Sequence, residues 1–466
     1  MRGPHPARRS FPVVVAAAPA PLAHDQLLVF LAAVAALLLL ARLLGALAER
    51  FGLPAVVGEL LTGVVLGPSL LGHLTPGVTG WLLPSDPRQM HLLDAVAQLG
   101  VLLLVGVTGT HVDLSVLSRY RRAAAAVSAC GLLIPLGLGI GLGLLIPASV
   151  SATPDPQRWT FALLVGVAVC VSAVPVIAKT LSDMRLMHRD IGQLILATST
   201  IDDVVGWLLL SLVAAAATVG LTAGAVGLAV GYLLGFMAFA ATVGRVVVRH
   251  VMEHAARSGE PGPAVTAAVI IVLLGAVTTH SLGMEALFGA LVAGVLIAAT
   301  RSAQVLLAPL RAFVLSVLAP LFLATAGLRM DLTALAEPTV ALTGLAVLAV
   351  AVVSKFGGAF LGAWLGRLNR WEALALGSGM NARGVIQVIV ALTGLRLGVL
   401  NTAMYTVVVL VAIVTSLMTP PLLRVATARV VERDDERLRR IEHDTWRDAR
   451  PVREVPPPAV ARADGP

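Results

Sequence analysis

Thirteen apolar segments, each long enough to cross a lipid bilayer as a helix, follow one another along most of this chain. They cover residues 26–48, 54–72, 92–109, 123–146, 159–180, 190–219, 222–243, 264–280, 284–300, 306–328, 338–366, 371–394 and 401–425. Hydrophobic residues make up 58% of the chain and charged residues 13%, about half the charged share of an average soluble domain. Because so few charges cannot cover a water-facing surface, soluble enzymes, disordered chains and disulfide scaffolds are excluded. We therefore predict an all-α polytopic membrane protein with about 13 transmembrane helices.

The basic residues of the loops predict how the chain is oriented. If the N-terminus lies outside, thirteen basic residues fall in the inner loops: Arg50, Arg119, Arg121, Arg122, Lys179, Arg185, Arg189, Arg245, Arg249, Arg257, Arg301, Arg367 and Arg370. The outer loops then hold four: Arg88, Arg158, Arg329 and Arg396. This bias follows the positive-inside rule. We expect a multi-pass protein of the cell membrane, with its N-terminus outside and its C-terminus in the cytoplasm.

Composition divides the chain into three regions. Residues 1–25 carry prolines within a short apolar stretch, which favours an N-terminal tail over a signal peptide. Residues 26–425 form the transmembrane domain, and residues 426–466 form a charged, proline-rich cytoplasmic tail too short for a folded nucleotide-binding domain. No phosphate-binding glycine motif occurs in a suitable context, so we expect no cofactor and no ATP-driven transport. The net charge of +8 is spread through loops, so no nucleic-acid partner is expected.

An adjacent pair of carboxylates, Asp202 and Asp203, lies in the middle of one apolar segment, in the run ATSTIDDVVGW. Burying an ionised carboxylate in a bilayer costs roughly 3 kcal/mol on insertion scales, so intramembrane acids mark functional sites by default. Neighbouring helical residues point about 100° apart, so one aspartate can face a partner while the other faces a cavity. Thr198 and Ser199 lie one turn earlier and can lend oxygen ligands to a hard monovalent cation. The alternative is a carboxylate pair at a loop or helix end.

Lys355 also interrupts an apolar segment, in the run AVVSKFGGAF. The chain has only two lysines, and the other, Lys179, lies at a predicted inner loop, whereas arginine is used almost everywhere else. A lysine in mid-segment suggests a group that must release its proton, which an arginine cannot do. The alternative is a lysine whose ammonium reaches the membrane interface.

Two segments contain helix-breaking or polar residues at mid-depth. The first includes Ser172 and Pro175, and the second includes Gly377, Gly379, Asn381, Arg383 and Gly384. Paired broken helices in a transporter place helix ends and free carbonyls at the substrate site. The alternatives are an ordinary proline kink and a re-entrant loop without a site.

Several runs together resemble one family. They are RFGLPAVVGELLTGVVLGPSLLG, VSAVPVIAKTLSD, TSTIDDVVGW, ALFGALVAGVLI, PLFLATAGLRMDL, SKFGGAFLGAWLG and MNARGVIQVIV, in this order between about residues 30 and 425. They are similar to the monovalent cation:proton antiporter-2 family, a branch of the sodium/proton exchangers that includes Kef-type and CHX-type transporters. The resemblance implies a homodimer in lipid. Each subunit would have inverted repeats, a dimerisation and a core subdomain, two crossed broken helices and an elevator-like movement.

The resemblance also implies roles for individual residues. Asp203 matches the principal carrier of the cation and the proton, and Lys355 matches the basic partner of Asp202. The first broken helix corresponds to Val171, Ser172, Ala173 and Pro175, and the second to Asn381, Arg383 and Gly384. Two adjacent aspartates resemble the electrogenic members of the family. Because no nucleotide-binding regulatory domain follows, as it does in Kef-type proteins, we do not expect nucleotide gating.

We therefore expect a secondary transporter that exchanges Na⁺, K⁺ or Li⁺ for H⁺ and is not an enzyme. Asp203, Asp202, Ser199 and Ser172 would bind the cation, and Asp202 and Lys355 would take part in proton movement. An electroneutral K⁺/H⁺ antiporter is the alternative. A potassium channel would need selectivity-filter repeats, and the sequence contains none.

Overall fold

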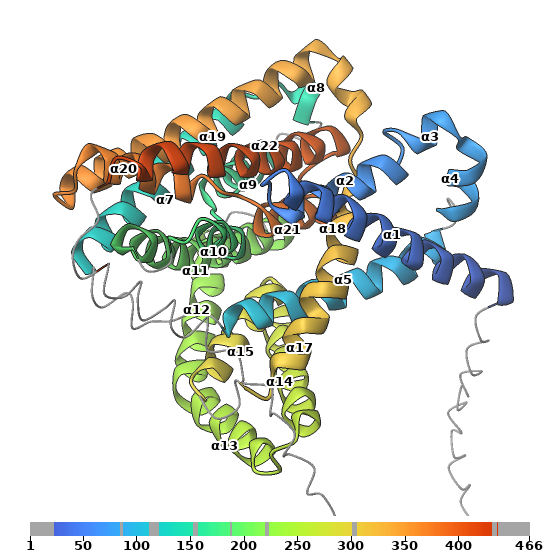
Figure 1. The fold of residues 1–466 in the computed structure, drawn as a ribbon, viewed down its shortest axis with the longest axis horizontal. Coiled ribbons are helices and arrows are strands. Elements are labelled where there is room, and N and C mark those ends of the chain that lie inside the picture. Colours follow the sequence, from blue (N-terminus) through green and yellow to red (C-terminus); the bar gives the residue numbers. More distant parts are fainter. Residues whose placement is uncertain are drawn as a thin grey trace, which may run out of the picture.

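The computed structural model describes residues 23–83, 87–110, 121–151, 157–186, 189–219, 223–300, 305–430 and residue 436. Within these ranges the regular structure is helical and no strand occurs (Figure 1). The predicted N-terminal tail, apart from its last three residues, and most of the predicted cytoplasmic tail lie outside the described residues.

Each of the thirteen predicted segments corresponds to one helix or one broken helix. Among the described residues, nine helices are long and apolar enough to cross a membrane, one bent pair passes the same test, and three apolar helices are shorter. The helices of the first half are α1 (His24–Arg50), α2 (Ala55–Leu66), α3 (Leu71–Leu74), α4 (Pro76–Leu82), α5 (Pro87–Gly109), α7 (Arg121–Leu145), α8 (Ala148–Ser151), α9 (Arg158–Cys170), α10 (Val174–Asp183) and α11 (Asp190–Val219). Those of the second half are α12 (Ala223–Phe239), η2 (Ala240–Gly244), α13 (Arg245–Ala256), α14 (Pro261–Ser281), α15 (Ala286–Ala298), α17 (Ala308–Phe313), η3 (Val314–Leu318), α18 (Ala319–Gly327), η4 (Leu332–Ala336), α19 (Pro338–Leu365), α20 (Arg370–Met380), α21 (Val385–Arg396) and α22 (Thr402–Thr427). The predicted all-α polytopic fold is confirmed.

The seventh segment differs from its prediction. The sequence places Arg245 and Arg249 in a loop, but α12 continues through a short π-helical turn into α13 and ends only at Ala256. This extension is amphipathic, since Val248 and Met252 are buried while the arginines are exposed. Hydropathy alone ends a segment where charges begin, although arginine is a good helix former.

The helices pack as two bundles (Figure 1). In the first, which we call the crossing bundle, α19 packs on α7, α7 on α9, α20 on α19 and α22, and α11 on α7, α9, α10 and α20. In the second, the flanking bundle, α1 packs on α2, α18 on α2 and α5, α15 on α5 and α14, and α13 on α14. The bundles meet where α2 contacts α22, α18 contacts α21, and α11 contacts α12 and α15.

The crossing bundle contains two similar units, each a long helix, a broken helix and a second long helix. The first unit is α7, α9–α10 and α11, and the second is α19, α20–α21 and α22. They begin at the fourth and the eleventh of the thirteen segments. Because an odd number of crossings separates them, the two units run through the membrane in opposite senses, which is the inverted repeat expected of such transporters.

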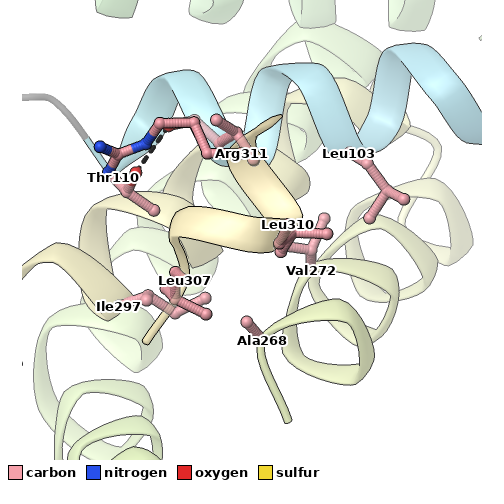
Figure 2. Close-up of a pocket in the computed structure, with 10 residues that line it drawn as sticks. Leu103, Thr110, Ala268, Val272, Ile297, Leu307, Leu310 and Arg311 are labelled. Atoms are coloured by element: carbon pink, nitrogen blue, oxygen red, sulfur yellow. Dashed lines mark hydrogen bonds between the residues drawn. The ribbon is translucent and has the colours of Figure 1, made fainter. Parts of the chain in front are cut away.

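The flanking bundle holds a small apolar cavity (Figure 2). It has a volume of about 10 Å³, at the lower limit for holding one water molecule. Leu103 of α5, Val272 of α14 and Leu310 of α17 line it, and Arg311 lies at its edge. No acidic residue is among its lining residues, so this cavity is not where a cation would bind.

Candidate functional site

Two helix breaks cross at the centre of the crossing bundle. The helix α9 ends at Cys170 and α10 begins at Val174, while α20 ends at Met380 and α21 begins at Val385 after a bend of 47°. The breaks are hydrogen-bonded to each other, since the Ala173 amide donates to the Ala382 carbonyl at 3.1 Å. The predicted pair of crossed broken helices is confirmed.

Local sequence explains the first break and the start of the helix that leads into the second. Val171 adopts an extended conformation, and Pro175 occupies the second position of α10, where a proline has no helical N–H to lose. At the other break, Asn369 caps the start of α20 with Glu372 in a capping box, so α20 is well defined up to the point where it stops. Helix ends whose carbonyls and amides lack partners within their own helices therefore meet at one place in the membrane.

Gly384 is required by the closeness of the two breaks. A Cβ at this position would lie 2.6 Å from Cγ2 of Val176 in α10. Val176 is buried, and its β-branched side chain has little rotational freedom in a helix. Glycine therefore permits the close approach of α21 and α10.

We expect Gly384→Ala to destabilise the protein by roughly 1–3 kcal/mol, as overpacking does in well-packed cores. Thermal unfolding in detergent measures this effect. The double variant Gly384→Ala/Val176→Ala should recover part of the loss because it removes the clashing methyl group. Equal melting temperatures for the single variant and the unchanged protein would contradict this role of Gly384.

Asp202 and Lys355 form a fully buried ion pair. Nζ of Lys355 lies 2.8 Å from Oδ2 of Asp202, and both side chains have zero exposure. The same ammonium donates to the Gly131 carbonyl of α7 at 3.0 Å. Lys355 therefore does not reach the membrane interface, which was the alternative reading of the sequence. Separating the two side chains would be costly, because each would then carry a buried charge with no opposite charge beside it.

Ser172 connects the ion pair to the crossing. Its Oγ lies 3.1 Å from Oδ2 of Asp202 and 2.9 Å from the Met380 carbonyl oxygen at the end of α20. A hydroxyl has one proton, so it can donate to only one of these two acceptors at a time. Ser172 thus links the first break, the second break and the acidic pair.

Asp203 has a different environment from Asp202. It is buried, it accepts a hydrogen bond from the Val174 amide at the start of α10, and no basic side chain of the described residues is hydrogen-bonded to it. Its Oδ1 has no hydrogen-bond partner among the described residues, and neither has Oδ1 of Asp202. The same holds for Oγ of Ser199 and for both amide atoms of Asn381.

Buried polar atoms without partners are rare, and several in one region call for water or an ion. Ser199 lies one turn before Asp203 on α11, as the sequence predicted. Asn381 ends α20, next to the carbonyl that contacts Ser172. The oxygen atoms of Asp203, Asp202, Ser199 and Asn381 are the hard ligands that a monovalent cation takes.

Thr198 is placed differently from Ser199. Its hydroxyl donates within its own helix, at 2.9 Å from the Leu194 and Ile195 carbonyl oxygens. Its own carbonyl accepts a hydrogen bond from Ser128 of α7 at 3.2 Å. The contacts of Thr198 therefore fix the position of α11 against α7, and none of them is to an aspartate.

Arg383 lies in the second break and is fully buried. Its guanidinium donates to the Ala168 carbonyl of α9 at 3.1 Å and to the Ala351 carbonyl of α19 at 3.0 Å. Ser416 of α22 donates to its backbone carbonyl. Ala351 lies one turn before Lys355 in α19. The two hydrogen bonds of Arg383 therefore connect the end of α9 to the helix that carries Lys355.

Several groups of this site could not be identified from the sequence. The Gly131, Met380 and Ala351 carbonyls belong to residues whose side chains carry no chemical signal. Gln387 does carry one, as an amide in an apolar run. It is buried, it donates to the Val408 carbonyl at 3.0 Å, and its Oε1 has no partner among the described residues.

The fold and the site together define a polytopic transporter with crossed broken helices. The family model described as "Sodium/hydrogen exchanger, transmembrane" matches residues 35–425. The chain therefore belongs to the sodium/hydrogen exchanger family. This family consists of transporters, in agreement with the resemblance that its motifs indicated.

Individual relatives agree with this assignment. The chain is 30% identical over 400 residues to the Na⁺/H⁺ antiporter NhaS4 of Synechocystis, covering 85% of this chain and 97% of the relative. It is 27% identical to the Na⁺/H⁺-K⁺ antiporter GerN of Bacillus cereus, covering 84% of this chain and 94% of that one. It spans only 43–48% of the plant and yeast cation/proton antiporters that it also matches.

A solved structure has the same fold. The sodium/proton antiporter MjNhaP1 from Methanocaldococcus jannaschii superimposes with a TM-score of 0.60, covering 86% of this chain and 97% of that chain. The two sequences are 16% identical, so the similarity establishes the fold alone.

Proposed function

We propose that this chain is an antiporter that exchanges Na⁺ or K⁺ for protons, with Asp203 as the group that both compete for. The observation that carries the proposal is the buried Asp202–Lys355 pair, at 2.8 Å, beside a second carboxylate that has no basic partner among the described residues. The relatives whose names specify exchange of sodium or potassium for protons support it.

Charge accounting explains why such a site exchanges ions and does not leak. The charges of Asp202 and Lys355 cancel, so Asp203 supplies one uncompensated negative charge. That charge is neutralised by one bound cation or by one proton, and it has no counter-charge when neither is bound. A buried carboxylate with neither a cation nor a proton beside it is costly inside a membrane, so the two loaded forms move across it more readily than the empty form. Coupled exchange follows from this difference in cost.

Lys355 adds a second proton to the cycle and makes the exchange electrogenic. When a cation shares the negative charge of Asp202 with Asp203, the ammonium of Lys355 loses its partner and releases a proton. On the other side, two protons return and one cation leaves. Lysine can do this and arginine cannot, because the guanidinium stays protonated at all physiological pH values.

The movement that exposes the site to each side is an elevator-like shift of the crossing bundle against the flanking bundle. A cavity of about 360 Å³ lies between the bundles at the predicted cytoplasmic side. Glu49 and Pro54 line it from the flanking bundle, and Lys179, Met184 and Arg424 line it from the crossing bundle. The charges of Lys179 and Glu49 lie 3.3 Å apart across it.

The opposite side is held shut by hydrogen bonds between the bundles. Tyr405 of α22 donates to the Ala326 carbonyl at 2.7 Å, and the hydroxyl of Thr406 accepts from the Asp331 amide at 3.0 Å. Arg396 of α21 donates to Gln98 of α5. This asymmetry supports a conformation that is open to the cytoplasm and must break these bonds to face outward.

We further propose a homodimer in the cell membrane, with the N-terminus outside and the C-terminus in the cytoplasm. Large apolar side chains are exposed along α1, α12, α13, α14 and α19, among them Leu39, Leu234 and Leu345. Such exposed apolar area marks contact with lipid or with a second subunit. The basic residues of the predicted inner loops support the orientation.

The test is cation-induced collapse of a pH gradient in proteoliposomes, with the membrane voltage clamped by a potassium ionophore or by a lipophilic cation. Na⁺ and K⁺ are each added in separate runs. We expect dequenching of a pH-sensitive dye whose rate changes with the imposed voltage, and the faster ion is the preferred substrate. An exchange rate that does not depend on the imposed voltage would favour the electroneutral alternative. No exchange with either ion would contradict the proposal.

A further inference from the structure

The chain beyond the last membrane helix docks on the crossing bundle. The guanidinium of Arg429 lies over the ring of Trp371, 4.3 Å from its centroid. The Val430 carbonyl accepts a hydrogen bond from Arg189 at 2.9 Å. Six residues later, Glu436 binds the same Arg189, with Oε2 3.1 Å from Nε, and its Oε1 accepts from the Asp190 amide at 2.6 Å. The sequence predicted only a charged tail here.

The carboxylate of Glu436 is deeply buried for a residue of a charged tail. Glu436 is 2% exposed, and the side chain of Arg189 is 11% exposed. Asp190 is the first residue of α11, so Glu436 accepts from a helix amide that lacks a partner within its own helix. A carboxylate at a helix start with an arginine beside it gains from both the helix dipole and a charge-assisted hydrogen bond.

These contacts connect the predicted cytoplasmic ends of three helices. The tail leaves α22, Trp371 lies in the first turn of α20, and Asp190 begins α11. The helices α11 and α20 are those that carry Asp202, Asp203 and the second break. We use the name tail strap for Arg429, Val430 and Glu436 together with these contacts.

The tail strap also borders a second cavity, which lies next to the cavity between the bundles. A cavity of about 340 Å³ is lined by Arg189 together with Met184, Leu186, Arg424, Thr427 and Ala428. Met184 and Arg424 also line the larger cavity of about 360 Å³. Arg189 thus places a positive charge at the second of these cavities, and Glu436 is the carboxylate paired with it.

We propose that Glu436 docks the tail on the crossing bundle through Arg189 and the start of α11. The tail strap holds the ends of α11, α20 and α22 together, and it masks the charge of Arg189 from cations that come from the cytoplasm. The docking of the tail is inferred from the contacts alone. The masking of Arg189 rests on the proposed function.

Hydrogen exchange measured by mass spectrometry on the purified full chain tests the docking. Glu436→Ala removes the acceptor of the Asp190 amide, and we expect protection at the start of α11 to fall by about tenfold, as for the loss of one hydrogen bond to a charged group. Glu260→Ala, which removes the same charge from an exposed position at the start of α14, should leave that protection unchanged. Equal protection in Glu436→Ala and the unchanged protein would overturn the proposal.

Transport kinetics test the masking of Arg189. Glu436→Gln exposes the positive charge, so the apparent KM for the cation on the cytoplasmic side should rise about twofold at low ionic strength, the effect of one unit charge roughly 10 Å away in water. The maximal rate should not change. The double variant Arg189→Gln/Glu436→Gln removes both charges and should restore the KM.

A structural role alone would leave the double variant as impaired as the single one, and that result would overturn the masking. An unchanged KM in Glu436→Gln would do the same. Absence of exchange in the unchanged protein would instead contradict the proposed function, while the hydrogen-exchange result on the tail strap would stand.

Discussion

Asp203→Asn is expected to reduce cation/proton exchange in proteoliposomes to the level of empty liposomes. The asparagine amide has nearly the same shape as the carboxylate, so packing around α11 is retained, but it carries no charge and takes up no proton. The site then has no group for which a cation and a proton can compete. Neither loaded form exists, and the exchange cycle cannot begin.

A matched control separates this effect from a general loss of charge. Asp25 is exposed in the first turn of α1, far in the sequence from the crossing, so Asp25→Asn should exchange at the rate of the unchanged protein. Both variants should elute and melt like the parent protein. If Asp203→Asn still collapsed a pH gradient on addition of Na⁺ or K⁺, Asp203 would not be the carrier.

The replacement of Lys355 is expected to have the second largest effect on exchange. Two variants are informative, because Lys355→Met removes the positive charge and Lys355→Arg keeps it. Lys355→Met removes the partner of Asp202 and leaves that carboxylate buried beside Ser172 with no opposite charge. Breaking one side of a buried pair costs about 3–5 kcal/mol, so we expect a large fall in melting temperature as well as loss of exchange.

Lys355→Arg keeps the charge and so should keep more of the stability. Its guanidinium does not release a proton, so the proton that lysine contributes leaves the cycle. We expect exchange that no longer responds to the imposed voltage, or no exchange at all. Voltage-dependent exchange at the rate of the unchanged protein would show that Lys355 has no part in proton movement and only balances the charge of Asp202.

Much of this site could be predicted from the sequence because its key residues are chemically out of place. Asp202, Asp203 and Lys355 stand in apolar runs, and a charge in hydrocarbon is conspicuous without any structure. The pairing of Lys355 with Asp202 followed from the resemblance to known antiporters, and the structure places the two side chains 2.8 Å apart. Ser172 and Gly384 were marked by the helix-breaking residues around them.

Other parts of the fold and the site could not be predicted from the sequence, also for physical reasons. The Gly131 and Met380 carbonyls take part through their backbones, which every residue has, so no side chain indicates them. The sequence places Arg245 and Arg249 in a loop because hydropathy reports where apolar residues end and not where a helix ends. Glu436 lies in a tail whose composition resembles a solvated segment, and only its contacts with Arg189 and Asp190 distinguish it.

The central claim is that a cation and a proton compete for one buried carboxylate. Isothermal titration calorimetry of Na⁺ or K⁺ into the purified protein, in two buffers of different ionisation enthalpy, measures the protons released on binding. We predict that binding releases protons and weakens as the pH falls, and that Asp203→Asn shows neither binding nor release. Binding that is independent of pH and releases no protons would contradict the account.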